Sequence, residues 1–505
     1  MKRLLSLALA VLLMAVANPF AIAEEEMPHI TVWVPLDNTM CEPDCPVVQA
    51  IREASGIYID PLFVPLGEAS SKLSARIASG DLPDVFAVNN VTAKDLIAHN
   101  MLLDMTDYLG ECPNIQADGM ERLTFGINAQ GPIYGLPQNM SQPWAMCVRR
   151  DWMRNLGYDV GDESVIEMTL SEFKDLMYQF GNDDPDQNGV DDTFGFCAED
   201  SAFGMFAPIF AAHGIPTADN WASMYYDEEE GVCKSILKHP EFPALLKDMQ
   251  WFYQNNCMDS EFAVVADAST EFQYLWNGTA GATSWAPAGP TNNWLSRYTD
   301  EDFVDENSFV YVNITDDEGG NGGAVIKYDS NWIVVSASCE QPEAAMKFLD
   351  FCYSKEGDYL TYFGIEGVHY QWTDKNEEKY EYIGKYAEDI SNQRTDGGWV
   401  IWSAYHADNN IQIRALTKIT SDVISYFKDH PISNAIIMFE VPEIASEVGS
   451  TLADVIIGVF AQATIAESED EIDALLAAAI EEYDKIGGIT YDEQYTELYK
   501  TMMGF

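Results

Sequence analysis

The sequence predicts an α/β protein of two lobes, and three observations support this fold class. Near the start of the chain, apolar runs and amphipathic stretches alternate in the order strand, helix, strand, helix, strand. This rhythm is typical of a mostly parallel sheet covered by helices. The chain has 505 residues, more than one hydrophobic core usually supports. From Pro442 onward the sequence is helical with acidic faces, which predicts a helical C-terminal part.

The first elements can be assigned in order along the chain. Strands are expected over residues 29–34, 57–63 and 85–88, and helices over 47–55 and 69–78. Gly56 and Gly80 end the two helices. Because ligands of such sheets bind beyond the carboxyl ends of the strands, we expect a binding wall there. Its first candidates are Trp33 and the pair Asn89 and Asn90.

A capping box marks the start of a later helix. In Thr169-Leu170-Ser171-Glu172, the threonine side chain accepts a backbone N–H and the glutamate reaches back, which predicts a helix over 173–180. Ser171 and Lys174 also have the Ser-x-x-Lys spacing of serine acyl-enzymes. The Ser-Asp-Asn and Lys-Thr-Gly motifs of those enzymes are absent from the sequence. The glycine-rich run 319–323 has no Lys-Ser/Thr and predicts a turn between strands, not a phosphate loop.

The N-terminus has the three parts of a secretory signal peptide. Lys2 and Arg3 precede an apolar run over 4–16, and Ala21-Ile22-Ala23 offers a cleavage site, so residues 1–23 are expected to be removed. No later segment reaches the roughly 20 apolar residues of a membrane span. The cleavage point has no cysteine, so no lipid-attachment residue is seen. We expect a periplasmic or extracellular protein.

The charge balance is strongly acidic. The chain has 27 basic and 82 acidic residues; without Lys2 and Arg3 the mature net charge is 25 − 82 = −57. Nucleic acid and anionic membrane surfaces would be repelled, so neither is an expected partner.

Nine cysteines all lie in the mature part of the chain. An odd number in an exported protein leaves at least one unpaired or bonded to another molecule. Cys41 and Cys45 are close enough in sequence to close a small disulfide, whereas a metal site would need a second Cys or His pair nearby.

Residues 183–193 carry the sharpest chemical pattern. Oxygen side chains alternate at Asp184, Asp186 and Asn188, Gly189 can take a sharp turn, Val190 can offer its carbonyl, and Asp192 follows. This matches the front half of a calcium loop, since Ca²⁺ takes six to eight oxygens. The loop is not an EF-hand, because Gly195 stands where the bidentate glutamate belongs. The alternative is a solvated Asx-turn loop without metal.

Several motifs together resemble the family 1 extracellular solute-binding proteins of carbohydrate ABC importers, most of all the larger alginate- and oligosaccharide-binding members. The matching segments are 73–84, 133–137, 148–157, 169–173, 342–350 and 364–370, in the family's order. The resemblance implies a two-lobed periplasmic-binding-protein fold, type II-like. It places residues 24–145 and 286–370 in lobe 1, and 146–285 and 371–505 in lobe 2.

The resemblance also implies a structural calcium ion in the second lobe. Its ligands would be Asp184, Asp186, Asn188, the carbonyl of Val190, and Asp192. Family members often have glutamate where this chain has Thr193, which leaves the sixth ligand to a second Asp192 oxygen or to water.

Aromatic and amide side chains beside turns suggest where a sugar binds. Pyranose rings stack on aromatic rings, while their hydroxyls need amide or carboxylate partners. The candidates are Trp33, Asn89, Asn90, Gln138, Asn139, Trp144, Trp285, Asn293, Trp399, Trp402 and Tyr405.

The function implied is that of a non-enzymatic binding protein. It would capture an oligosaccharide between two lobes and deliver it, as a monomer, to the membrane permease subunits of an ABC importer. Two alternatives remain: a secreted glycoside hydrolase, whose two carboxylates could hide among 82 acids, and a sugar-sensing or adhesive module.

Overall fold

The computed structural model describes most of the chain. The described residues are 27–36, 41–117, 131–137, 143–198, 205–216, 223–263, 273–287, 289–293, 306–324, 331–376, 379–388, 396–397, 418–430, 432 and 442–503. Within these ranges no helix has both the length and the apolar character needed to cross a membrane. The signal peptide predicted over residues 1–23 lies outside them.

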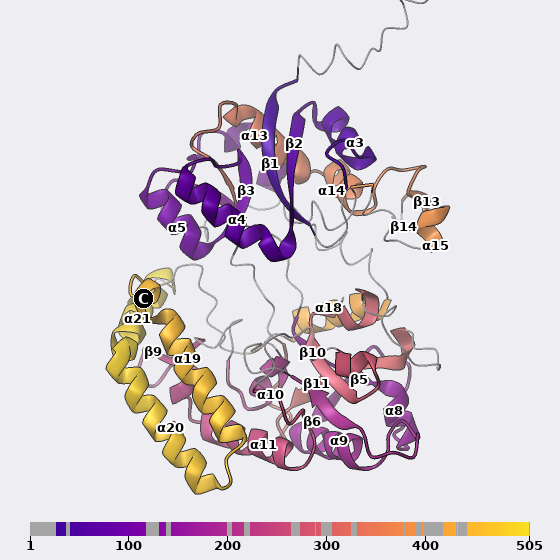
Figure 1. Cartoon of the computed structure of the whole chain (residues 1–505), viewed down its shortest axis with the longest axis vertical. Coiled ribbons are helices and arrows are strands. Elements are labelled where there is room, and N and C mark those ends of the chain that lie inside the picture. Colours follow the sequence, from indigo (N-terminus) through magenta and orange to yellow (C-terminus); the bar gives the residue numbers. More distant parts are fainter. Residues whose placement is uncertain are drawn as a thin grey trace, which may run out of the picture. The chain divides into compact units, whose positions relative to one another are not determined.

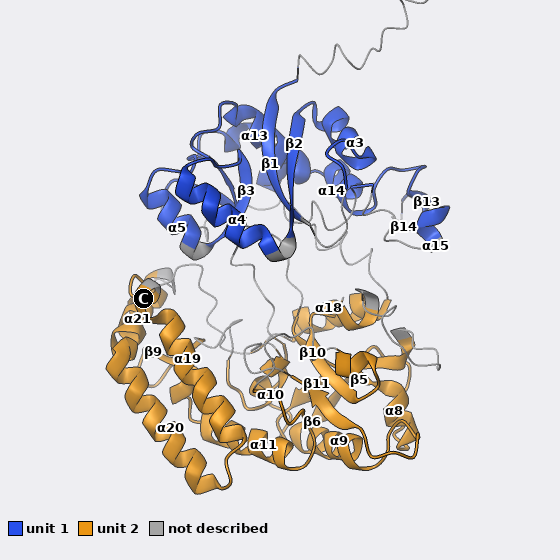
Figure 2. Ribbon diagram, in the orientation of Figure 1, with its two compact units in different colours: residues 1–139, 329–411 blue, residues 140–328, 412–505 orange. Residues whose placement is uncertain are grey.

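The chain forms two compact units, coloured separately in Figure 2. Unit 1 contains residues 1–139 and 329–411, and unit 2 contains residues 140–328 and 412–505. Each unit has its own sheet and its own hydrophobic core, as the length of the chain predicted.

The sheet of unit 1 has five strands in the order β2-β1-β3-β12-β4. They are β1 (His29–Leu36), β2 (Tyr58–Pro65), β3 (Val85–Asn89), β4 (Gly135–Pro137) and β12 (Asn331–Val335). β1 pairs in parallel with β2 and β3, and β12 runs antiparallel to β3. The strands of the predicted β-α-β-α rhythm therefore do form a parallel sheet.

Helices cover the unit 1 sheet (Figure 1). They include α3 (Pro46–Ser55), α4 (Leu66–Ser79), α5 (Asn90–Ala98), α13 (Pro342–Cys352) and α14 (Lys355–Tyr362). Gly80 ends α4 with a φ of 72°, a left-handed conformation that favours glycine. A small hairpin, β13 (Tyr370–Asp374) and β14 (Lys379–Tyr382), packs its aromatic side chains on Phe363 just after α14.

Unit 2 is built around a second five-stranded sheet, in the order β6-β11-β5-β10-β7. The strands are β5 (Ala145–Arg149), β6 (Val165–Thr169), β7 (Phe194–Cys197), β10 (Ala280–Trp285) and β11 (Phe309–Thr315). β11 is parallel to β6 and β10 is parallel to β7, while β5 runs antiparallel to both of its neighbours. The amino end of β5 thus lies at the carboxyl edge of the other four strands.

The helices of unit 2 include the predicted C-terminal helical part. They are α8 (Arg150–Asn155), α9 (Leu170–Asn182), α10 (Ala207–Ala212), α11 (Phe242–Gln254), α18 (Lys418–Asp429), α19 (Ala445–Thr464), α20 (Glu469–Tyr483) and α21 (Ile489–Met503). Leu452, Ile456 and Phe460 of α19 belong to the same buried core as Phe173 of α9. The apolar positions of this region are therefore core, as expected.

The lobe boundaries inferred from the resemblance need correction in three places. Residues 140–145 belong to unit 2. Residues 286–328 belong to unit 2, because β11 pairs with β5 and β6 in its sheet. The segment that contains β13 and β14 belongs to unit 1, because Tyr370 and Trp372 pack against Phe363.

Candidate functional site

Two tryptophans meet at the carboxyl edge of the unit 2 sheet. Trp285 ends β10 and Trp144 precedes β5, and the register pairs Trp285 with Ala145. The two rings contact edge to face, with centroids 4.4 Å apart and an interplanar angle of 80°. Both side chains are half-buried, so part of each indole remains accessible. Carboxyl edges of parallel strands are where α/β sheets bind ligands, which makes this pair the central feature of the candidate site.

Polar groups at the same edge are already bonded within the protein. Thr169 accepts the Glu172 backbone N–H at 3.2 Å and Glu172 Oε2 accepts the Thr169 N–H at 2.9 Å, so the predicted capping box is confirmed. Ser171 donates its hydroxyl to Asp317 Oδ2 at 2.7 Å, and this bond lowers the pKa of Asp317. Lys174 bonds Asp248 at 2.5 Å. Ser171 and Lys174 therefore do not form an acyl-enzyme pair.

The corresponding edge of unit 1 carries Asn89. It ends β3 opposite Asn331, and its side chain accepts the Thr92 N–H at 2.9 Å, which caps α5. Asn89 is exposed and stands at the carboxyl end of β3. Asn90 is the first residue of α5, and its side chain lies outside the described set.

Trp33 lies within strand β1 and is only 3% exposed, which is deeper than expected for a binding wall. It lines a cavity of about 740 Å³ between β2 and α4, together with Phe63, Lys72 and Arg76. The guanidinium of Arg76 lies 5.8 Å from the Trp33 ring centroid and bonds Asp81 at 2.8 Å. Lys72 pairs with Glu68 at 2.7 Å. Both cations of this cavity are thus partnered by carboxylates.

The remaining predicted ligand residues are not placed. Gln138, Asn139, Trp399, Trp402 and Tyr405 lie outside the described residues. Asn293 ends the π-helical turn Gly289–Asn293, and only its backbone is described.

Arg149, a cation at the end of β5, is buried. Its exposed fraction is 3%, its Nε donates to Asp151 Oδ1 at 2.8 Å, and its guanidinium lies 5.2 Å from the Trp152 ring centroid. It therefore holds the β5–α8 junction instead of facing a ligand.

The predicted calcium loop is tightly curled, with positive φ at Asp184 (48°), Gln187 (58°) and Gly189 (79°). The Gly189 N–H donates to Asp184 Oδ2 at 3.1 Å. The Asn188 amide donates to Asp186 Oδ2 at 2.8 Å and to Asp192 Oδ1 at 3.2 Å. Three carboxylates thus converge on Asn188 and Gly189.

The electrostatics of this loop show an excess of negative charge. Burial raises the pKa of Asp186, and the neighbouring Asp184 and Asp192 raise it further. Thr193 is buried and donates its hydroxyl to the Phe180 carbonyl at 2.8 Å, so its side chain faces away from the loop. Among the described residues, no group of three His, Cys, Asp or Glu side chains is spaced to hold a metal ion.

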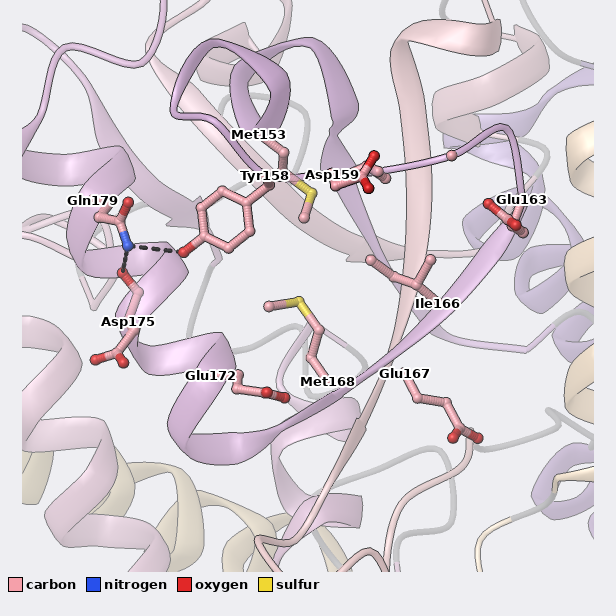
Figure 3. Close-up of a pocket in the computed structure, with 12 residues that line it drawn as sticks. Met153, Tyr158, Asp159, Glu163, Ile166, Glu167, Met168, Glu172, Asp175 and Gln179 are labelled. Atoms are coloured by element: carbon pink, nitrogen blue, oxygen red, sulfur yellow. Dashed lines mark hydrogen bonds between the residues drawn. The ribbon is translucent and has the colours of Figure 1, made fainter.

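A second cavity, of about 680 Å³, was not anticipated from the sequence (Figure 3). Its apolar lining includes Met153, Ile166 and Met168, and Tyr158 accepts a hydrogen bond from Gln179 at 2.8 Å. Five carboxylates also line it: Asp159, Glu163, Glu167, Glu172 and Asp175. No motif marks this cavity, because its lining comes from α8, β6, α9 and the loop that joins α8 to β6.

The comparisons with known proteins agree with this architecture. Residues 47–359 match the family model described as bacterial extracellular solute-binding protein. Lipoprotein LipO of Bacillus subtilis is 25% identical over 353 residues, covering 65% of this chain and 64% of LipO. The polygalacturonan/rhamnogalacturonan-binding protein YtcQ of the same organism is 24% identical over 346 residues, covering 66% and 64%. The chain thus spans 64% of the length of each of these two curated relatives.

Solved structures match over almost the whole chain. An HMO binding solute-binding protein associated with an ABC transporter of Bifidobacterium longum infantis has a TM-score of 0.69 at 16% identity, covering 94% of this chain and 99% of that one. Alginate-binding protein AlgQ2, solved without calcium ion, has a TM-score of 0.67 at 15% identity, and the match covers 94% of this chain and 98% of AlgQ2. Streptococcus pneumoniae FusA in complex with kestose has a TM-score of 0.67 at 14% identity, and the match covers 94% of this chain and 99% of FusA. These likenesses establish the fold.

Proposed function

Since the chain belongs to the bacterial extracellular solute-binding proteins, we propose that it binds an oligosaccharide outside the cytoplasmic membrane and delivers it to an ABC importer. The names of its relatives support the ligand class, because YtcQ binds polygalacturonan and rhamnogalacturonan and FusA was solved with kestose.

The observation that carries the proposal is the contact between Trp144 and Trp285 at the carboxyl edge of the unit 2 sheet. Two half-buried indoles at right angles offer a ring face and a ring edge to one ligand. The C–H face of a pyranose stacks on such a surface, because both surfaces are apolar and the aromatic face carries partial negative charge. Indole N–H groups can also donate to sugar hydroxyls.

The charges of the described residues favour a neutral oligosaccharide over a uronate, in contrast to YtcQ, which is named for two galacturonate polymers. Arg149 is buried against Asp151, and Lys72 and Arg76 in the Trp33 cavity each bond a carboxylate. To pair with one of these three cations, an anionic sugar would have to displace its carboxylate and approach a mature chain of net charge 25 − 82 = −57. A thermal-shift screen of neutral and uronate oligosaccharides tests this choice. A neutral sugar should raise the midpoint of unfolding, and stabilisation by uronates alone would reverse the charge assignment.

Binding without turnover is the second part of the proposal. The family and its structural neighbours are binding proteins, and an importer needs its cargo intact. The competing function is a glycoside hydrolase with two carboxylates about 5–10 Å apart on either side of the bond. Incubation of labelled oligosaccharide with pure protein separates the two. Unchanged sugar supports the binding protein, and shortened sugar whose release is lost on mutating one carboxylate supports the hydrolase.

We further propose export by residues 1–23, action as a monomer, and permease subunits as the protein partner. LipO is called a lipoprotein, and this chain has no cysteine at the predicted cleavage point. Co-purification with membrane permease subunits is expected. Capture by a sensory receptor instead would favour the alternative of a sugar-sensing module.

Calcium at residues 183–193 is the proposed cofactor. Asp184, Asp186 and Asp192 each accept a hydrogen bond from Asn188 or Gly189, and moving these carboxylates closer together than they now lie would give the all-oxygen ligands that Ca²⁺ prefers. The Asn188 amide points its N–H₂ group at two of these carboxylates. Its Oδ1 accepts the Val190 N–H at 2.6 Å, so the side chain would have to leave this bond before Oδ1 could reach a cation. The carbonyl of Val190 would add a ligand, and the ion would neutralise the carboxylates that raise the pKa of Asp186.

A further inference from the structure

Residues 41–45 form a fixed turn before α3. The Cys45 N–H donates to the Glu42 carbonyl at 3.0 Å, which closes the turn. The side chain of Arg52, itself 7% exposed, bonds Asp44 Oδ1 at 2.6 Å and the Pro43 carbonyl at 3.4 Å. The turn therefore holds Cys41 and Cys45 in a defined relation.

The two thiols face each other inside the protein. Cys41 is 9% exposed and Cys45 is 6% exposed, and their side chains are hydrogen-bonded. Cys45 is the N-cap residue of α3, where backbone N–H groups stabilise negative charge. The Cys41 hydrogen bond lowers the pKa of Cys45, with help from the Val48 N–H, while the same bond and burial raise the pKa of Cys41.

The surroundings of the pair tie it to the rest of unit 1. Gly397, with a φ of 86°, has no side chain and so leaves room for the Cys45 sulfur. Any other residue at position 397 would place its Cβ 2.3 Å from Cys45 Sγ. The Val47 N–H donates to the Asp396 carbonyl at 2.9 Å. Cys41 itself lines the cavity that contains Trp33. A covalent link between the thiols would thus fasten one wall of that cavity to the start of α3.

We propose that Cys41 and Cys45 form a reversible disulfide when the protein is outside the cell, and that this bond staples the wall of the Trp33 cavity. Extracellular compartments permit disulfides, and the pair is adjacent, buried and held by the turn. The proposal rests on the cysteine pair and is independent of which solute the protein binds.

The chemistry is an exchange with an external small-molecule disulfide RSSR, such as oxidised glutathione. Cys45, whose pKa is lowered, attacks one sulfur of RSSR as its thiolate, forms a mixed disulfide and releases one RS⁻, which takes up the proton that Cys45 has lost. Cys41 then attacks Cys45 Sγ and expels the second RS⁻, which takes up the Cys41 proton. Two protein thiols are oxidised, and one RSSR is reduced to two RSH.

Other cysteines differ from this pair in their electrostatics. Burial raises the pKa of Cys112 to about 11 and that of Cys233, Cys257 and Cys339 to about 12. Because the thiolate is the reactive form, these thiols should exchange more slowly than Cys45, whose pKa is lowered.

The test is mass spectrometry of the full-length mature protein equilibrated with oxidised glutathione, alkylated in denaturant and digested. The peptide with Cys41 and Cys45 should carry no alkyl group and be lighter by two hydrogen atoms than its reduced form. Cys41→Ser should leave Cys45 alkylated or glutathionylated, and the control Cys112→Ser should leave the linked peptide unchanged. Alkylation of both residues in the oxidised parent, or pairing of either with a third cysteine, would overturn the proposal.

Thermal unfolding tests the staple itself. Reduction should lower the midpoint of the parent by a few degrees, because it reopens a short loop, and should leave the double variant C41A/C45A unchanged. Equal midpoints for oxidised and reduced parent would contradict a stapling role.

Discussion

The indole rings of Trp144 and Trp285 meet edge to face with their centroids 4.4 Å apart, although they come from distant segments of the chain. The antiparallel pairing of β5 with β10 brings them together, because it sets Ala145 opposite Trp285. Neither residue is among the deepest of the core, in contrast to Trp152 and Trp332, which are 1% and 0% exposed. Both rings pack in part against the unit 2 core, and we propose from their position and exposure that their accessible parts form a ligand platform.

Replacing Trp144 or Trp285 with Ala should therefore weaken oligosaccharide binding by about 1–3 kcal/mol, through loss of stacking and of buried apolar area. Calorimetric titration measures this loss. The core control Trp332→Ala should instead lower the free energy of unfolding by about 3–5 kcal/mol. If both platform variants unfold like the control while their folded fraction binds normally, the two residues are core and the site lies elsewhere.

Calcium should stabilise the protein through residues 183–193. Adding Ca²⁺ to chelator-treated protein should raise the midpoint of unfolding, since an ion at a hundredfold excess over its Kd contributes about 2.7 kcal/mol. Asp186→Ala should abolish the response, and Glu229→Ala, in an exposed turn of the same unit, should retain it. A parent that melts identically with and without chelator has no functional calcium site.

Asp248 should link stability to pH. Burial would raise its pKa, but the contacts of its carboxylate with His213 at 3.1 Å and with Lys174 at 2.5 Å outweigh burial and lower it. Because the folded-state pKa lies below the ordinary value of 3.8, the stabilisation is complete above that pH and is lost as pH falls through the folded-state value.

The variant Asp248→Asn should thus lose about 1–3 kcal/mol of unfolding free energy at pH 7 and show a weaker acid dependence. Denaturant unfolding from pH 2 to pH 7 measures both effects. The control is an exposed ion pair, Lys247 with Glu469 at 2.7 Å. The variant Glu469→Gln should have the same unfolding free energy and acid dependence as the parent. An unchanged acid profile in Asp248→Asn would rule out this linkage.

The capping box at the start of α9 gives a local test of the fold. Thr169→Ala should cost about 1 kcal/mol, because the Glu172 N–H loses its acceptor, whereas Thr169→Ser should cost little. Equal losses in the two variants, measured by denaturant unfolding, would mean that the hydroxyl does not stabilise the helix.

Local patterns predicted much of this structure, because their causes are local. Apolar runs defined β1, β2 and β3, and Thr169 with Glu172 defined the start of α9. Strand pairing is a long-range property, so the sequence did not reveal that β11 joins β5 and β6 in unit 2.

The burial of side chains was harder to predict than the positions of strands and helices. Trp33 and Arg149 stand beside turns or strand ends in the sequence, yet both are 3% exposed. The cavity beside Tyr158 draws its lining from three elements and a loop, and no spacing along the chain marks such a surface.

Isothermal titration of the mature protein with neutral oligosaccharides, followed by chromatography of the recovered sugar, tests the central claim most directly. We predict binding with a Kd of about micromolar or tighter, roughly 8 kcal/mol or more, and recovery of the sugar unchanged. The affinity should fall by about 1–3 kcal/mol in Trp144→Ala and Trp285→Ala. Absence of binding across the neutral panel, or recovery of shortened sugar, would contradict the account.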